Sequence, residues 1–144
     1  MKLERRVITV MFVFLFYFGC NYIAPYNQHA YEQTTSLKVE ALSLVAKANE
    51  PYSDHEREIA QFKLKMLKAH EYARGIPRNS DATEQWAILI NPAGKSMFGF
   101  LDFWEKNNRM STLFTEEYKK EIKKHFNAII ELEAAKMSSD DLKL

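Results

Sequence analysis

The sequence predicts an all-α fold, a small bundle of four main helices behind an N-terminal hydrophobic signal or anchor helix. From residue 28 onward, apolar residues recur at three- and four-residue steps, the spacing of one face of an α-helix. No stretch shows the sustained apolar–polar alternation of a half-buried strand. The connections between the periodic stretches are short, as in helical bundles. The chain has 144 residues, which is the length of one folded domain. Its content of only four Gly and four Pro argues against a collagen-like or disordered chain.

The N-terminal segment has the pattern of a secretory signal. Residues 2–6 hold three basic side chains and one acidic side chain, and the apolar run 7–18 follows them. A basic stretch before 7–15 apolar residues is typical of a signal peptide. A helix of about 12 residues rises only about 18 Å, which is well short of the ~30 Å hydrocarbon core of a bilayer. We therefore expect residues 1–19 to be a targeting segment.

The segment ends in Tyr17-Phe18-Gly19-Cys20. This string resembles the lipobox of bacterial lipoproteins, in which a small residue, here Gly19, precedes the cysteine that becomes the lipidated N-terminus. The resemblance is confined to about the first 20 residues, and it is shared with many small bacterial lipoproteins of unknown activity. It implies cleavage before Cys20, a lipid on Cys20, and Tyr17, Phe18 and Gly19 as the context of the cleavage site.

The alternative is an uncleaved anchor. Residues 7–24 form 18 residues in which Asn21 is the only strongly polar one, which reaches the length needed to span a membrane. The positive charges at residues 2–6 would leave the rest of the chain outside the cytoplasm. Both interpretations predict a body tethered to the membrane on the extracytoplasmic face of the bacterial envelope, in the periplasm or at the cell surface.

The charges of the body give no case for nucleic acid. Removing residues 1–19 lowers Lys plus Arg from 20 to 17 and Asp plus Glu from 19 to 18, so the remainder carries about −1. The single cysteine, Cys20, rules out an intrachain disulfide and a zinc site built from cysteines.

The body is expected to begin with a tether, residues 20–27, and to fold over residues 28–137. The first helix covers about residues 28–48, and Glu50-Pro51 ends it because the residue before proline is disfavoured in the α region. Its predicted buried face consists of Ala30, Thr34, Leu37, Ala41, Leu44, Val45 and Ala48.

The second helix is predicted to open with a capping box, Ser53 with Glu56. Gly75 suits a left-handed residue just past its end, with Ile76 folding back on the last turn. The predicted buried face consists of Ile59, Phe62, Met66, Leu67, His70 and Ala73.

The third helix is predicted to be broken. Asp81 with Glu84 offers a second capping box at its start, and a turn at residues 91–94, containing Pro92 and Gly94, interrupts it. Ser96 is expected to cap the second half, which Asn107-Asn108 closes.

Thr115 is expected to cap the final helix, and residues 138–144 read as a disordered tail. The apolar stripe of this helix consists of Tyr118, Ile122, His125, Phe126, Ile129 and Ile130.

The second half of the broken helix has more large apolar residues than one helical face can hold. They are Met97, Phe98, Phe100, Leu101, Phe103 and Trp104. One interpretation is an element buried all round at the centre of the bundle. The other makes Met97, Phe98, Phe100, Phe103 and Trp104 a possible surface for a partner or the membrane interface.

Catalytic and cofactor patterns are weak. Gly94-Lys95-Ser96 follows an apolar run, but a phosphate-binding loop needs glycine where Leu89 stands. The histidines fit neither the Glu-x-x-His nor the His-Glu-x-x-His pattern. His70 and His125 remain weak candidates for metal or haem ligands, but a single histidine on an apolar face is usually a core residue.

We expect the chain to have no enzymatic activity and to bind no cofactor. The predicted function is that of a tethered binding or accessory protein, held in the membrane by its N-terminal lipid or anchor and associated with another envelope protein. The alternatives are a bundle that binds haem, a metal or a small ligand, and a signal-anchored single-pass protein.

Overall fold

The structure is a computed structural model that describes residues 23–137. The predicted signal 1–19, Cys20 with Tyr17, Phe18 and Gly19, and the tail 138–144 lie outside the described residues. The described elements are α2 (Gln28–Ala46), a 3-10 turn η1 (Tyr52–Asp54), α3 (Glu56–Gly75), α4 (Ser80–Ile90), α5 (Met97–Asn107) and α6 (Thr112–Ala134).

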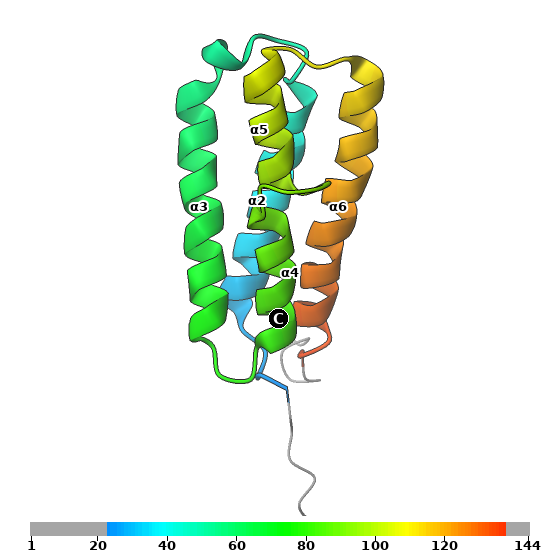
Figure 1. The fold of residues 1–144 in the computed structure, drawn as a ribbon. Coiled ribbons are helices and arrows are strands. Elements are labelled where there is room, and N and C mark those ends of the chain that lie inside the picture. The colour runs from blue at the N-terminus through cyan, green and yellow to red at the C-terminus, as the bar shows by residue number, and fades with distance from the viewer. Residues whose placement is uncertain (1–22, 138–144) are drawn as a thin grey trace, which may run out of the picture.

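The helices form an up-and-down bundle with four columns, and this confirms the predicted all-α bundle (Figure 1). Helix α2 runs up, α3 runs down, α4 and α5 follow each other up the same column, and α6 runs down. The columns of α2 and α4 each pack against both α3 and α6. The third column is broken between α4 and α5, around Pro92, as the sequence predicts.

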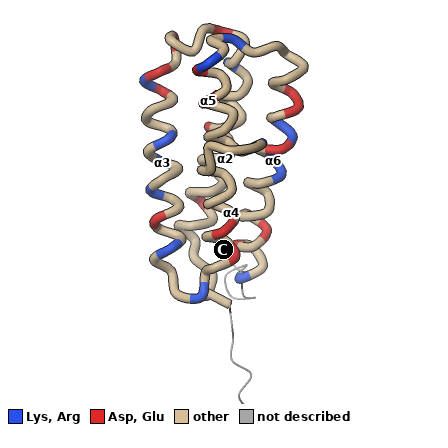
Figure 2. Tube along the Cα trace, in the orientation of Figure 1, with Lys and Arg blue, Asp and Glu red and all other residues tan. Residues whose placement is uncertain are grey.

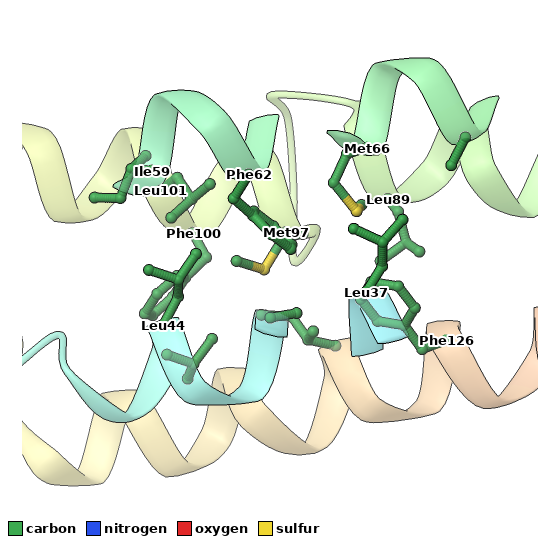
Figure 3. Close-up of a cluster of buried hydrophobic side chains, with 14 of the residues drawn as sticks. Leu37, Leu44, Ile59, Phe62, Met66, Leu89, Met97, Phe100, Leu101 and Phe126 are labelled. Atoms are coloured by element: carbon green, nitrogen blue, oxygen red, sulfur yellow. The ribbon is translucent and has the colours of Figure 1, made fainter. Parts of the chain in front are cut away.

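The core lies along the axis of the bundle. Side chains from every helix point toward one another there, and Figure 3 shows part of this cluster. Every residue of the buried face predicted for the first helix is buried, although Ala48, the last of them, lies after the end of α2 at Ala46. In α3, Leu67 is exposed and His70 is half-buried, so the α3 face is narrower than predicted, and Ala69 completes it. The largest fully buried side chains include Trp104, Phe62, Phe100, Phe126, Leu44 and Ile59.

Three predicted helix starts are wrong. Helix α3 begins at Glu56 without a side-chain cap, because the backbone N–H of Tyr52 donates to the carbonyl of Asn108 (2.8 Å) and residues 52–54 form a separate 3-10 turn. Helix α4 begins at Ser80, after Asn79, so Asp81 lies inside its first turn. Helix α6 is capped by Ser111, and Thr115 donates its hydroxyl to the Ser111 carbonyl (3.0 Å).

The predicted end of the second helix is also wrong. Gly75 belongs to α3 and has no positive φ. The left-handed residue is Arg78 (φ 63°), three positions later, where the carbonyl accepts a hydrogen bond from the backbone N–H of Ala24 (3.2 Å). The left-handed turn of the α3–α4 connection therefore lies at Arg78 and not at Gly75, and Ala24 binds to the connection at this turn.

The break in the third column is tight. Gly94 has φ 81°, and Ser96 caps α5 as predicted by accepting from the backbone N–H of Gly99 (2.8 Å). The Ser96 hydroxyl also donates to the carbonyl of Asn91. Asn108, with φ 61°, ends α5 as predicted.

The bundle has two ends, which carry different connections (Figure 1). The tether-side end holds Ile23, the α3–α4 connection and the last turn of α6. The far end holds the α2–α3 and α5–α6 connections, which the hydrogen bond from the Met110 N–H to the Ala48 carbonyl (2.7 Å) joins. Over residues 23–137, none of the helices combines the length and the hydropathy needed to cross a membrane.

Candidate partner-binding surface

Aromatic side chains from α5 and α6 meet at the surface near the far end. The rings of Phe103 and Phe114 are stacked with their centroids 4.7 Å apart, and Tyr118 lies 4.7 Å beyond Phe114. Phe103 is 41% exposed, and Phe114 and Tyr118 are half-buried. Leu113, beside Phe114 in the chain, is 83% exposed. We call Phe103, Leu113, Phe114 and Tyr118 the α5–α6 aromatic surface.

The predicted surface residues of α5 divide between core and exterior. Met97, Phe100 and Trp104 are fully buried, so for them the interpretation as core residues is confirmed and the alternative of a partner or membrane surface is wrong. Phe98 is half-buried and packs beneath the ammonium group of Lys63, which lies 5.6 Å from the ring centroid. Phe103 alone of the five is exposed. The described part of the chain therefore retains one predicted surface residue and adds three from α6.

Phe100 supports the aromatic surface from within. Its ring lies 5.4 Å from Tyr118 and 6.3 Å from Trp104, so it connects the surface rings to the core of the far end. The indole N–H of Trp104 donates to the carbonyl of Glu50 (3.1 Å), in the α2–α3 connection. The exposed rings thus stand on a packed base, which favours a preformed binding surface.

His55 and two carboxylates complete the far end. The imidazole packs 5.5 Å from Trp104, its Nε2 lies 2.6 Å from Glu50 and its Nδ1 lies 3.5 Å from Glu58. Lys47 forms an ion pair with Glu58 (2.7 Å), and this hydrogen bond is the main cause that holds the pKa of the Glu58 carboxyl below its usual value. These residues fasten the α2–α3 connection beneath α5. No sequence motif predicts this cluster, because the contact between His55 and Trp104 forms only through the fold.

An ion pair crosses from the broken column to α6 beside the aromatic surface. Lys95, in the α4–α5 connection, pairs with Glu117, one residue before Tyr118. This hydrogen bond raises the pKa of Lys95 and lowers the pKa of Glu117. Figure 1 shows the α4–α5 connection reaching toward α6 at this level. Both side chains are more than half exposed to solvent, so the pair marks the edge of the surface more than it stabilises the fold.

The tether-side end contains a buried polar network. The ammonium group of Lys136 contacts Glu133 (2.8 Å) and the side-chain oxygen of Asn79 (2.5 Å), with side-chain exposures of 6% for Lys136 and 2% for Glu133. Asn79 in turn donates its side-chain N–H to the carbonyl of Ala73 (3.1 Å), and because its Oδ1 accepts from Lys136 that oxygen does not cap α4. One oxygen of Glu133, Oε2, is buried without a hydrogen-bond partner among the described residues. The network joins the end of α6 to the α3–α4 connection.

A cavity of about 280 Å³ adjoins this network. It combines apolar and charged side chains, and Ile23, where the chain enters the bundle, is part of its lining. The lining residues are Ile23, Arg78, Asn79, Ser80, Asp81, Ala82, Leu132, Ala135 and Lys136.

The two histidine candidates lie on different helices. His70 is on α3, half-buried with its Nδ1 3.9 Å from Glu71, and His125 is half-buried on α6. Helices α3 and α6 each pack mainly against α2 and α4. Across the described chain, no group of three or more His, Cys, Asp or Glu side chains is arranged to hold a metal ion. A metal or haem role for His70 and His125 stays a prediction.

Comparisons with known proteins add no relative. No protein-family model matches the chain, and neither a search of curated proteins nor one of solved structures gives a significant match.

Proposed function

We propose that this chain is a membrane-tethered, non-enzymatic binding protein of the bacterial envelope, which uses the α5–α6 aromatic surface to dock a partner protein. The observation that carries the proposal is the stacked, partly exposed Phe103–Phe114 pair, together with the exposed Leu113 that precedes Phe114 in the chain. Exposed apolar side chains that occur singly are normal, but a contiguous patch is typical of an interaction site. Aromatic residues are also enriched among the residues that contribute most to binding energy.

The surface lies at the end of the bundle opposite the tether (Figure 1). Helix α3, with 20 residues, spans about 30 Å along the bundle. A protein held in a membrane by its N-terminus would have its anchor at the end opposite Phe103 and Leu113, which leaves this surface free to meet other envelope proteins. Tethering raises the effective concentration of a binding surface without any new contact.

We favour lipidation of Cys20 over an uncleaved anchor. Ala24 is only 3% exposed and its backbone N–H donates to the Arg78 carbonyl, so Ala24 belongs to the bundle. This leaves at most residues 7–23 for a membrane span, a helix of about 26 Å against a hydrocarbon core of ~30 Å. The shortened run supports an anchor made by a lipid.

The binding surface can be tested by site-specific photocrosslinking in cells of the native host. A photoreactive phenylalanine analogue at Phe103, and separately at Leu113, is expected to give one adduct of the same added mass. The matched control carries the analogue at Val39, which is exposed on α2 away from the surface. In the Leu113-labelled chain, Phe103→Ser is expected to reduce the adduct yield, since loss of an aromatic anchor weakens binding by about 30-fold. Equal labelling from Val39, or no adduct from either surface position, would contradict the proposal.

Anchoring is tested in the same cells. Intact-mass measurement of the membrane fraction should find a chain that begins at Cys20 and carries lipid. Cys20→Ser should abolish this processing and leave the chain without lipid mass. A mature chain with an intact Met1 would replace lipidation with the uncleaved anchor, whatever the crosslinking shows.

A further inference from the structure

The chain enters the bundle in a docked conformation. Besides the hydrogen bond from Ala24 to the carbonyl of Arg78, the side chain of Asn27 donates to the hydroxyl of Tyr72 on α3 (2.9 Å). His29 packs edge-on against the same ring, with the centroids 4.9 Å apart. Asn27 also caps α2 by accepting from the N–H of Ala30 (3.0 Å). Residues 24–29 are therefore part of the folded body, and the residues expected to form the tether contribute little free length.

This docking limits how far the bundle can stand from its anchor. Only four peptide units separate Cys20 from Ala24. A fully extended chain spans at most about 3.5 Å per residue, so Ala24 lies within about 14 Å of Cys20. With a lipid on Cys20, the cysteine itself lies at the bilayer surface. The tether-side end of the bundle must then lie against the same surface.

The residues at this end suit a lipid surface. Ile23 is 68% exposed, and the α3–α4 connection carries the exposed Pro77 beside the half-buried Ile76. Basic residues flank this apolar tip. Arg78 follows Pro77, and Arg74, which pairs with Glu71 (2.8 Å), precedes it. Figure 2 shows basic residues at the lower end of α3 and in the connection that follows it.

An apolar tip flanked by arginines is typical of segments that lie in a membrane interface. The apolar side chains enter the boundary between headgroups and acyl chains, and the guanidinium groups interact with lipid phosphates. Long basic side chains also keep their charge among the headgroups while their methylene stems cover apolar surface.

We propose that the tether-side end, formed by Ile23 and residues 76–78, is a bilayer-contacting surface that holds the bundle upright on phospholipid. The inference rests on the anchoring part of the proposed function. It adds an orientation: the bundle axis points away from the membrane, and the α5–α6 aromatic surface stands beyond the length of α3. A free, flexible tether would allow any face to meet the bilayer, whereas the docked Ala24 does not.

The test uses the full-length lipidated chain in vesicles of phosphatidylethanolamine and phosphatidylglycerol (3:1). Lipidation of Cys20 leaves no other thiol, so an introduced cysteine is labelled alone with an environment-sensitive fluorophore. Pro77→Cys reports on the α3–α4 connection, and Ile23→Cys is a second variant should the turn at Pro77 not tolerate the change. Leu113→Cys at the far end and Val39→Cys on the side of α2 are the matched controls. The vesicles carry a quencher on the lipid headgroups.

The label at position 77 or 23 is expected to be quenched at least about threefold more than the labels at 113 and 39. Equal quenching at 39 and 77 would mean that the bundle lies on its side, and it would overturn the proposal. No quenching at 77 and 23 would overturn it as well. The intact mass of each labelled chain is measured in parallel. If that mass lacks lipid at Cys20, the proposed anchoring fails, and this result is distinct from a lipidated chain whose tether-side end stays away from the bilayer.

Discussion

Phe103 and Trp104 are neighbours in the sequence with opposite environments. Successive residues in a helix point about 100° apart, so one can face the core while the next faces solvent. Trp104 reaches the carbonyl of Glu50 and is fully buried, whereas Phe103 stacks on Phe114 and stays 41% exposed. Composition alone could not separate them. Phe103 belongs to an aromatic surface because its ring stacks on that of Phe114 in α6.

At the residue scale, Glu58 predicts a pH dependence of stability. Its carboxyl has a lowered pKa, mainly because Lys47 donates to it. A lowered carboxyl pKa contributes stability that is fully present above the ordinary value of 4.5 and is lost as the pH falls through the folded-state pKa. Since the pair is largely exposed, we expect Glu58→Gln to remove only about 0.2–1 kcal/mol at pH 7, with a smaller loss near pH 3.

The measurement is the free energy of urea unfolding between pH 3 and 7, followed by circular dichroism. Glu84→Gln is the control, because the described structure shows no ion pair for this exposed carboxylate. If the Glu58→Gln and parent chains lose stability in parallel below pH 4.5, the Lys47–Glu58 pair does not contribute as stated.

At the scale of elements, some helix ends are set by local hydrogen bonds and others by contacts with distant parts of the chain. Ser96 caps α5 as the sequence predicts, because its bond to the Gly99 N–H is formed within four residues. The two predicted capping boxes at Ser53 and Asp81 do not form. Tyr52 is held by Asn108, 56 positions away, and this contact has no local sequence signal. The presence of each helix can be predicted from the sequence. The residue at which a helix begins or ends can be predicted only where no distant contact competes with the local cap.

Gly99 tests the close packing at the break in the third column, and Gly75, at the end of α3, is the matched comparison. A methyl group added at Gly99 would lie 2.5 Å from the carbonyl oxygen of Gly94, whereas one added at Gly75 meets nothing within 4 Å. We expect Gly99→Ala to destabilise the fold by about 1–3 kcal/mol through overpacking. Gly75→Ala should stabilise it by about 0.5 kcal/mol, because alanine favours helix more than glycine does. Thermal and urea unfolding of both variants measures the difference. A Gly99→Ala chain as stable as Gly75→Ala would show that the Gly94–Gly99 contact relaxes freely.

At the scale of the whole molecule, the bundle is closed at both ends by long-range contacts. The bond between Met110 and Ala48 joins the two connections of the far end, and Lys136 with Asn79 joins α6 to the α3–α4 connection. Trp86 on α4 packs edge-on against Phe126 of α6, with the ring centroids 6.0 Å apart. Trp104 on α5 packs against His55 at the far end. The broken column therefore has a tryptophan in each half.

This arrangement predicts cooperative unfolding despite the break between α4 and α5. In Trp86→Phe the remaining fluorescence reports on α5, and in Trp104→Phe it reports on α4. Within each variant, the urea midpoint from fluorescence should coincide with the midpoint from circular dichroism at 222 nm, as expected for a small two-state domain. An earlier fluorescence transition in Trp86→Phe would mean that α5 detaches before the rest of the bundle unfolds.

Residue spacing predicted the helices, the buried face of the first helix, the break near Pro92 and the all-α class. These follow from periodicity and from local bonds such as that of Ser96, which involve residues within a few turns of each other. In the predicted stripe of α6, Ile122, Phe126 and Ile129 are buried, whereas Tyr118, His125 and Ile130 are only half-buried. Cys20 as the lipidated residue remains a prediction of the sequence alone. Long-range packing places Trp104 in the core and Phe103 at the surface, adds Phe114 and Leu113 to that surface, and docks Ala24 on Arg78. Each of these depends on a partner far away in the chain, and the spacing of residues along one helix carries no information about such partners.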